Sequence, residues 1–368
     1  MSGDLATPAG SGWSEARPVD IDGIERELEG LLRSPQADGE PVVSRACMSN
    51  LMVFARGADQ AAEVASEIAA IAEHHPSRVL LLVDESGSDP GPHAWVSTLC
   101  HLGEGGRRIC SEQVSIRAGG EALRRLPSIA RPLLVGDLPT ALWWAAAMPP
   151  PLGGDLFFEL AAMARRVIWD SAAWEQEAHG LACVGDWAGG VDPAIGLSDL
   201  AWVRLAPWRS MVAGVLGGSA AELRTVRIEH GPHALPKALL FVGWLASRLG
   251  WRPWAPGRVG GDAARWEFTS TSGSISVEVC RIAEAAPAIV AVILGTVVGG
   301  MGREVVVRRS VDGRLVRDLA APAMGSTVSG PSSSRGSLVS RELPDLDGDP
   351  LYRAALPFAR ALATDVVR

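Results

Sequence analysis

The first regular pattern of hydrophobic positions along the chain is helical. Isoleucines and leucines recur every three or four residues in IDGIERELEGLLR, residues 21–33, which predicts a short amphipathic helix. The twenty residues before it are rich in Gly, Ser, Ala, Pro and acidic residues, and they lack the basic start and apolar core of a signal peptide. We expect residues 1–44 to form a flexible arm that carries this helix.

The next stretch alternates strand-like and helix-like patterns. Apolar runs at 51–54 and 79–83 flank a helical pattern at 59–74, an order typical of two parallel strands joined by a helix. Further strands are predicted at 93–100, 113–118, 140–145 and 167–169, and further helices at 121–130, 156–165 and 200–216. We therefore expect residues 45–217 to form an α/β layer domain with a mainly parallel or mixed sheet.

The pattern changes after residue 217. A predicted strand and a Trp- and Leu-rich helix are followed by long strand-like segments joined by turns that contain glycine, at 224–228, 235–249, 264–271, 274–282, 288–298 and 304–309. This order predicts a smaller α+β domain with an antiparallel sheet over residues 218–368. Composition predicts a flexible loop near 325–336, and Asp349-Pro350 suits the start of a last helix that reaches about Val367.

Composition and charge exclude several classes of protein. A formal charge of −8 and a pI near 5.5 argue against a general nucleic-acid binder or a membrane-surface protein. The longest apolar run, about 15 residues long, is broken by Pro and Gly, whereas a spanning helix needs about 20. Five widely spaced cysteines without a CxxC pair suggest neither a disulfide framework nor a zinc site, so we expect reduced thiols and a cytoplasmic protein.

A search for catalytic motifs finds no nucleotide-binding loop, no nucleophile elbow and no metalloprotease signature. His230 and His233 have an HxxH spacing, but Gly and Pro between them indicate a loop before the 235–249 helix. Lys237, the one lysine of the chain, is interpreted as a solvated residue in the first turn of that helix. The sequence therefore predicts no catalytic residue, no cofactor and no metal site.

Six stretches of the chain resemble the OpcA family of glucose-6-phosphate dehydrogenase assembly proteins, and they occur in the family's order. We call them the motif segments: RACMSNLMVFARG (45–57), HPSRVLLLVDESG (75–87), ICSEQVSIRAGGEAL (109–123), LPSIARPLLVGDLPTALWWAAAMPP (126–150), RRVIWDSAAW (165–174) and LSDLAWVRLAPWRSMV (197–212). The remaining C-terminal third matches the family only loosely.

The resemblance implies a non-catalytic partner that assembles with glucose-6-phosphate dehydrogenase and activates it allosterically. The candidate contacts with this partner are Asp137, Trp143, Trp144, Trp208 and Arg209, because Trp and Arg are favoured anchors at interface centres. Adjacent strand residues point to opposite faces, so in a sheet covered by helices on both sides Trp143 and Trp144 are each expected to be buried against a different helix layer, as core of the domain. If either indole reaches the partner, we expect only one of the two to do so.

An alternative function stays open at this point. The α/β domain could instead belong to an enzyme that binds a sugar phosphate or a nucleotide at the carboxyl ends of its strands. That hypothesis predicts turnover, or tight binding of a small molecule, by the isolated protein. The activator hypothesis predicts a change in the kinetics of the dehydrogenase.

Overall fold

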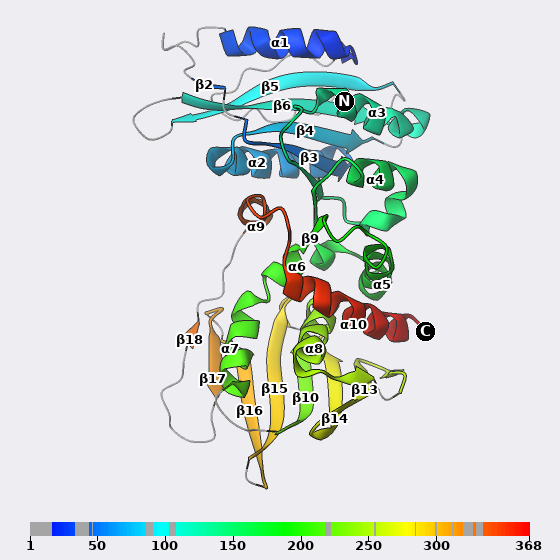
Figure 1. The fold of residues 1–368 in the computed structure, drawn as a ribbon, viewed down its shortest axis with the longest axis vertical. Coiled ribbons are helices and arrows are strands. Elements are labelled where there is room, and N and C mark those ends of the chain that lie inside the picture. Colours follow the sequence, from blue (N-terminus) through cyan, green and yellow to red (C-terminus); the bar gives the residue numbers. More distant parts are fainter. Residues whose placement is uncertain are drawn as a thin grey trace. The chain divides into compact units, whose positions relative to one another are not determined.

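The computed structural model describes residues 17–33, 44–45, 47–85, 91–102, 108–217, 222–253, 255–283, 285–298, 300–310, 312–318, 327–328 and 334–368. The chain forms two compact units (Figure 1). Unit 1 comprises Met1–Trp169, Asp192–Ser198 and Ser333–Gly348, and unit 2 comprises Asp170–Val191, Asp199–Ser332 and Asp349–Arg368. The sequence placed the boundary near residue 217, whereas the units divide after Trp169 and two later segments return to unit 1.

In the described residues, unit 1 is built on a mixed sheet of nine strands, and this confirms the expected α/β fold class. The strand order is β1-β5-β6-β4-β3-β7-β8-β9, with β2 beside β6. Neighbouring strands from β6 through β8 are parallel, and β5 runs antiparallel to β6. The strands are β1 (Arg17–Pro18), β2 (Ser44–Arg45), β3 (Ser49–Arg56), β4 (Ser77–Asp84), β5 (His93–Leu102), β6 (Arg108–Ala118), β7 (Thr140–Trp144), β8 (Arg166–Trp169) and β9 (Gly196–Asp199).

Helices cover both faces of this sheet, and Figure 1 shows α1 and α2 on opposite sides of it. The helices of unit 1 are α1 (Ile21–Arg33), α2 (Ala58–His74), α3 (Leu126–Leu133), α4 (Gly154–Ala161) and α9 (Arg335–Glu342), with 3₁₀ turns η2 (Gly120–Arg125) and η3 (Pro150–Gly153). Because both faces are covered, the middle of each central strand is a continuous apolar run, and all eight residues of β4 are buried, including the polar residues at its two ends.

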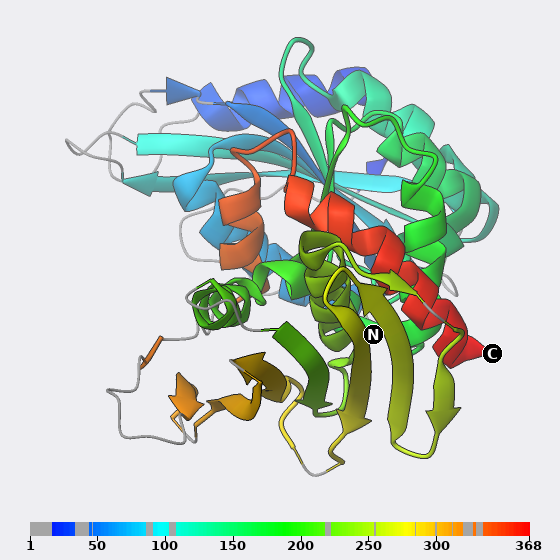
Figure 2. The same ribbon diagram turned by 60° about the horizontal axis from the view of Figure 1, so that its bottom comes forward.

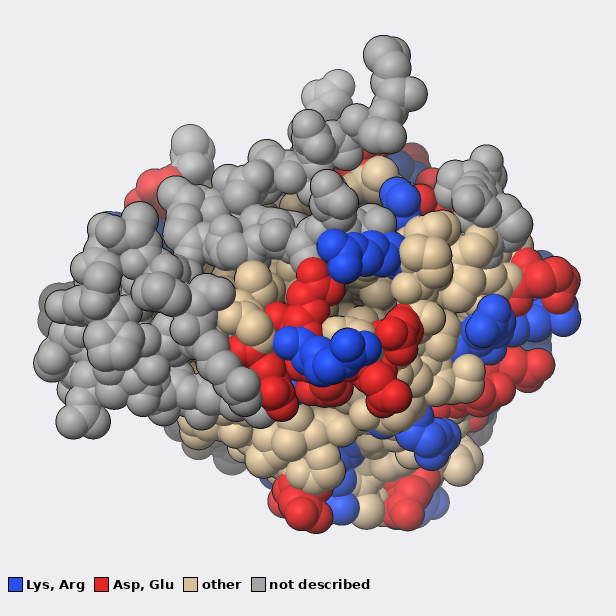
Figure 3. Space-filling model, turned by 90° about the horizontal axis from the view of Figure 1, so that it is seen from above, with Lys and Arg blue, Asp and Glu red and all other residues tan. Residues whose placement is uncertain are grey.

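Helix α1 has the bounds that the sequence predicts, and it is held to the sheet by both apolar and charged contacts. Ile24 and Leu28 are buried beneath it. Glu25 accepts a hydrogen bond of 2.8 Å from Arg78, whose Nε also donates to Glu112 at 2.6 Å. The outer surface is polar, and Figure 3 shows acidic and basic side chains side by side on this face. The predicted arm is therefore docked along residues 21–33, while residues 1–16 lie outside the described residues.

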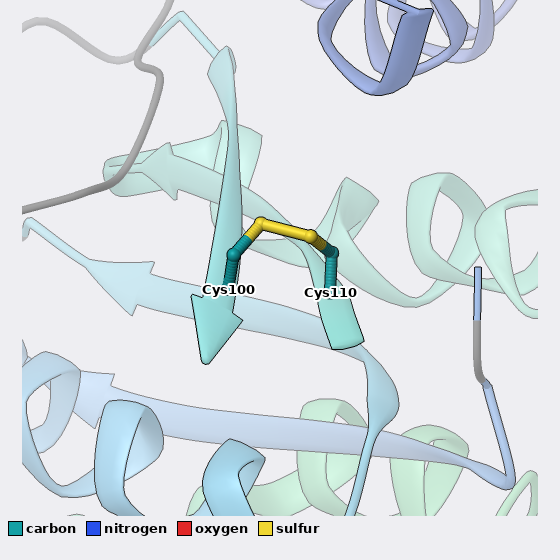
Figure 4. Close-up of a disulfide and its surroundings, with 2 residues drawn as sticks. All are labelled: Cys100 and Cys110. Carbon is teal, nitrogen blue, oxygen red and sulfur yellow. A yellow bond between two sulfur atoms is a disulfide. The ribbon is translucent and has the colours of Figure 1, made fainter. Parts of the chain in front are cut away.

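The expectation that the cysteines form no disulfide is wrong for one pair. Cys100 on β5 and Cys110 on β6 lie directly opposite each other in the antiparallel register, with their Cα atoms 4.1 Å apart, and their sulfurs are bonded (Figure 4). The sequence predicts strands at 93–100 and 113–118, and the second of these begins five residues after the start of β6. The expectation of reduced thiols rests on the number and spacing of the cysteines, and neither reveals the register that brings this pair together. Among the described residues, Cys183 and Cys280 form no disulfide.

Unit 2 contains a second sheet of nine strands, and most of its neighbours are antiparallel, as expected. The order is β11-β13-β14-β10-β15-β16-β17-β18, with β12 beside β13, and β10 and β14 are the parallel pair. The strands are β10 (Glu222–His230), β11 (Arg252–Pro253), β12 (Arg258–Gly260), β13 (Ala263–Ser270), β14 (Gly273–Arg281), β15 (Ile289–Val298), β16 (Met301–Arg309), β17 (Leu315–Asp318) and β18 (Thr327–Val328).

The helices of unit 2 lie on one face of this sheet (Figure 2). They are the 3₁₀ turn η4 (Ser171–Ala173), α5 (Glu177–Ala188), α6 (Leu200–Val203), α7 (Ala206–Leu216), α8 (Leu235–Leu249) and α10 (Pro350–Val367). Helices α8 and α10 touch closely at Gly243, where an added Cβ would lie 2.5 Å from the Ala355 oxygen. Any larger residue at Gly243 would therefore push the two helices apart.

The end of the chain divides between the two units. The predicted loop near 325–336 falls mostly outside the described residues. Ser334 is the N-cap residue of α9, because its side chain accepts the Ser337 N–H. Arg335 then donates to Glu67 of α2, which holds this segment in unit 1. Asp349 caps α10 through the Leu351 N–H, as the sequence predicts.

Among the described residues, no helix has the length and apolarity needed to cross a membrane.

Candidate functional site

Two aspartates from separate motif segments organise the start of unit 2. Asp170 accepts the Ala172 N–H at 3.2 Å and so caps η4. Asp199 accepts the Ala201 N–H at 2.9 Å and so caps α6. Asp199 also accepts the Ser171 N–H at 3.1 Å, which belongs to the other turn. These caps satisfy N–H groups that would otherwise be left without a partner at each helix start, and they fix the two turns side by side.

Arg204 closes this arrangement from the end of α6. Its two terminal nitrogens donate to the two oxygens of Asp170, at 2.7 and 2.9 Å. A forked contact of this kind is stronger and more directional than a single hydrogen bond. The pair therefore locks the segment of residues 165–174 to the segment of residues 197–212.

Asp199 itself is fully buried, and this changes its titration. Burial, helped by the nearby charge of Asp170, raises the pKa of Asp199 from its ordinary value of 3.8 to about 6. The hydrogen bonds from Ser171 and Ala201 oppose this change. The protein therefore holds a carboxyl in its interior that takes up a proton in mildly acidic conditions.

Lys237 lies close to the same cluster, and the expectation that it is solvated is wrong. Its side chain is only 9% exposed, and Nζ donates to the Pro287 oxygen at 3.2 Å. Burial, followed by the charge of Arg204, lowers its pKa to about 8, and the charges of Asp170 and Asp199 act in the opposite direction. Sequence alone gave no signal of this burial, because it depends on the loop before β15.

The predicted partner contacts Trp208 and Arg209 lie in the next turn of the chain. Trp208 is buried. The Arg209 guanidinium stacks 3.6 Å above the Trp202 ring and lies 3.6 Å from Asp349, which also accepts the Trp202 indole N–H at 2.7 Å. These contacts tie α6 and α7 to the start of α10.

Trp143 and Trp144, also predicted as partner contacts, occupy the centre of the sheet in unit 1. Both lie on β7 and are no more than 1% exposed. Trp144 stacks on Phe54 with ring centroids 4.1 Å apart, and its indole N–H donates to the Met148 oxygen at 3.0 Å. An added Cβ on Gly153 would lie 2.6 Å from the Trp144 ring, so the packing there is tight. Both tryptophans therefore contribute to the core of the unit.

Asp137, the remaining predicted contact, is exposed on the loop before β7. Its φ of 65° lies in the left-handed region, which Asp and Asn adopt more readily than most residues. Buried Asn50 holds the base of this loop, because its Nδ2 donates to the oxygens of Val135 and Leu138 and its Oδ1 accepts the Val135 N–H at 2.9 Å. The loop borders an open cavity of about 750 Å³, with Arg165 and Asp347 also in its lining.

The polar motif residues are thus mostly engaged with one another. Unit 1 pairs Arg78 with Glu112 at 2.6 Å, and unit 2 pairs Asp170 with Arg204. Within the described residues, no set of three or more His, Cys, Asp and Glu side chains is arranged to hold a metal ion. His233 lies in the loop before α8, as expected from the sequence, whereas His230 is the last residue of β10 and not part of that loop.

The buried carboxyl of Asp199 generates a prediction about stability and pH. The folded state retains a proton between about pH 4 and pH 6 that the unfolded state has released, so this contribution to stability is complete below pH 4 and is lost as the pH rises through 6. Its full size is about 3 kcal/mol. Asp199→Asn keeps an oxygen for both N–H groups and removes the titration, so it should flatten this part of the profile.

Urea unfolding at several values between pH 4 and pH 7 measures this effect for the natural protein and for Asp199→Asn. We expect the unfolding free energy of the natural protein to fall with rising pH more steeply than that of the variant. Equal slopes for the two proteins would show that Asp199 does not titrate in this range.

Comparison with protein families finds two adjacent matches that together run from residue 68 to residue 356. Residues 68–185 match the glucose-6-phosphate dehydrogenase subunit N-terminal domain of OpcA proteins, and residues 195–356 match the corresponding C-terminal domain. The "Putative OxPP cycle protein OpcA" of Nostoc punctiforme is 34% identical over 199 residues, which is 52% of this chain and 42% of that protein. The protein of the same name from Synechocystis is 30% identical over 192 residues, 50% of this chain and 39% of that protein.

The chain matches about half or less of the length of these curated relatives. Among solved structures, a levoglucosan dehydrogenase in complex with NADH and L-sorbose is 13% identical, with a TM-score of 0.47 and coverage of 87% of this chain and 97% of that one. An NAD-binding oxidoreductase from Klebsiella pneumoniae is 14% identical, with a TM-score of 0.46 and coverage of 87% and 97%. Likeness at this level supports no conclusion about activity. The two family matches and the curated relatives agree with the motif segments, and the chain belongs to the OpcA family.

Proposed function

We propose that this protein is a non-catalytic assembly factor and allosteric activator of glucose-6-phosphate dehydrogenase in the oxidative pentose phosphate pathway. The observation that carries the proposal is that both matched domains are described as domains of a glucose-6-phosphate dehydrogenase subunit. The names of the curated relatives, which refer to the OxPP cycle, support the same pathway. The proposal places the protein in the cytoplasm with that enzyme, with no nucleic-acid or membrane partner and no cofactor.

The contacts of the motif residues support a non-catalytic role. A catalytic acid or base must reach a substrate, whereas the Glu112 side chain is buried against Arg78 and the Asp170 carboxylate is occupied by Arg204. Asp199 is fully buried beneath the start of α6. The polar groups in these segments are therefore committed to the fold, which favours action through the protein surface.

An activator works by binding the active arrangement of its partner more tightly than the inactive one. The activation cannot exceed the ratio of the two affinities, because a ligand shifts an equilibrium only by its differential binding. A coupling of about 1–3 kcal/mol changes an apparent affinity by roughly 5- to 150-fold. A protein–protein interface of ordinary area is sufficient for a coupling free energy of this magnitude.

Among the predicted partner contacts, Asp137 is the one that we propose to face the dehydrogenase. Trp143, Trp144 and Trp208 are buried, and the Arg209 side chain, 13% exposed, is stacked on Trp202. Asp137 instead stands exposed on a loop whose base is held by Asn50. A rigid loop with an exposed charge loses little conformational entropy on binding.

The proposal is tested by mixing the purified protein with glucose-6-phosphate dehydrogenase from the same organism and following NADP reduction. We expect the two proteins to co-elute, and we expect the apparent KM for glucose 6-phosphate to fall about 5- to 150-fold. The protein alone should reduce no NADP. Unchanged kinetics without co-elution would refute the proposal, and turnover by the protein alone would favour the alternative of a sugar-phosphate or nucleotide enzyme.

The contact at Asp137 is tested with Asp137→Asn, because Asn tolerates the left-handed backbone and the variant loses only the charge. An exposed charge at the rim of an interface affects mainly the association rate and its salt dependence. We expect affinity for the dehydrogenase to fall about two- to tenfold at low salt, with a smaller difference at high salt. The matched control is Glu159→Gln on α4, which also removes an exposed charge of unit 1. Equal affinities for the two variants would place the contact elsewhere.

A further inference from the structure

Unit 2 contains a cavity of about 540 Å³ to which the function proposed above assigns no role. It lies where the strands β10 and β14 end and the helices α5 and α8 begin. Its lining includes His230, Ala264 and Val279 from the sheet, and Leu235 from α8. This volume falls within the range of sites that bind small molecules.

Two helix starts meet at this cavity, and Glu177 joins them. Glu177 is the first residue of α5, and its Oε2 accepts the N–H of Leu235, the first residue of α8, at 3.1 Å. Its Oε1 lies 3.5 Å from His233 Nδ1. Both oxygens of this carboxylate are therefore occupied. No side chain of the described residues caps the first turn of α5, so its N–H groups provide a partial positive charge at the edge of the cavity.

Arg281 adds a full positive charge to the same cavity. It ends β14 directly beside His230 in the parallel register, and it lines the cavity. Across the part of the chain that the structure describes, its guanidinium has no ion-pair partner. An arginine fork matches the oxygens of a phosphate or a carboxylate. The cavity therefore offers a free guanidinium next to an uncapped helix start.

His230 contributes a hydrogen-bond acceptor. Its side chain is 4% exposed, and Nδ1 lies 2.8 Å from the Gly231 oxygen. Burial lowers the pKa of His230, and the charge of Arg281 adds to this, so the ring is neutral near pH 7. Because a carbonyl only accepts, Nδ1 carries the proton and Nε2 holds a lone pair. Within the described ranges no hydrogen bond to Nε2 is found, and His230 lines the cavity, so a hydroxyl group of a ligand would supply a donor for this lone pair.

The loop that carries these groups has little freedom to rearrange. An added Cβ on Gly231 would lie 1.9 Å from the Ala286 oxygen, so glycine is required there. His233, two residues on, has a φ of 54° in the left-handed region. The position of His230 relative to α8 is therefore fixed before any ligand binds, which reduces the entropy cost of binding.

We propose that this cavity binds a small phosphorylated polyol. The phosphate contacts Arg281 and the first-turn N–H groups of α5, and a hydroxyl group donates to Nε2 of His230. Carboxylates at the mouth, Glu175 and Asp262, accept hydrogen bonds from further hydroxyl groups. A bound cation is not favoured, because the oxygens of Glu177 are already occupied and no metal-binding set of side chains occurs among the described residues.

The experiment is calorimetric titration of the purified protein, without the dehydrogenase, with three separate probes: sorbitol 6-phosphate, sorbitol and inorganic phosphate. We expect sorbitol 6-phosphate to bind with a higher affinity than inorganic phosphate, and sorbitol alone not to bind. Arg281→Ala should weaken the binding of sorbitol 6-phosphate by at least about tenfold, because a charge-assisted contact is lost. Arg281 is exposed, so the fold should tolerate this change.

The matched control is Arg303→Ala on β16, which removes an exposed arginine of the same sheet that does not line the cavity. This variant should bind sorbitol 6-phosphate like the natural protein. Equal losses in the two variants would overturn the proposal, since they would indicate a nonspecific charge effect. The absence of binding by any probe, or equal affinities for inorganic phosphate and sorbitol 6-phosphate, would overturn it as well. Because no dehydrogenase is present, these results do not depend on the activator proposal.

Discussion

A charge that is removed from water has to find a counter-charge inside the fold, and the family motif segments of this protein supply those pairs. In unit 1, Arg78 on β4 and Glu112 on β6 are almost completely buried against each other, and Arg78 also reaches Glu25 on α1. In unit 2, Asp170 and Arg204 form a forked pair between two segments. A lone charge at either place would be strongly destabilising, so each pair requires both of its segments to be present and in register.

This constraint explains why the polar groups of the motif segments, where the structure describes them, are mostly committed to the fold. Their charged groups bind one another, and their aromatic residues fill the cores, as Trp144 does between Phe54 and Gly153. The polar groups that a partner or a ligand can reach lie outside these buried pairs. Asp137 stands on an exposed loop of unit 1, and Arg281 and His230 border a cavity in unit 2. Both sites suit a protein that acts by binding.

Local signals allowed much of the fold to be predicted from the sequence. Residues 21–33 and 235–249 have the helical bounds that their apolar periodicity predicts, and Asp349-Pro350 starts the last helix. Helices α5 and α9 were missed. The first contains two glycines and the second is mostly polar, so neither has a clear apolar stripe. Turns and helix caps depend on interactions between residues that are close in sequence, so the sequence alone predicts them.

Features that depend on distant segments could not be predicted in this way. The return of α9 to unit 1 depends on Arg335 meeting Glu67, more than 260 residues earlier in the chain. The burial of Lys237 depends on the loop at Pro287, and the disulfide depends on the register between β5 and β6, which places Cys100 opposite Cys110. For the candidate site, the βαβ pattern predicts the burial of Trp143 and Trp144, whereas the burial of Trp208 and the stacking of Arg209 on Trp202 depend on contacts that the sequence does not reveal.

The claim that buried pairs between motif segments hold the fold together is tested most directly by a double-mutant cycle on Arg78 and Glu112. The unfolding free energies of Arg78→Met, Glu112→Gln and the double variant would be measured by urea denaturation. We predict a loss of about 3–5 kcal/mol for each single variant, and a loss in the double variant that is at least about 1.5 kcal/mol smaller than their sum. Additive losses within about 0.5 kcal/mol would contradict the account, because they would show that the two charges do not depend on each other.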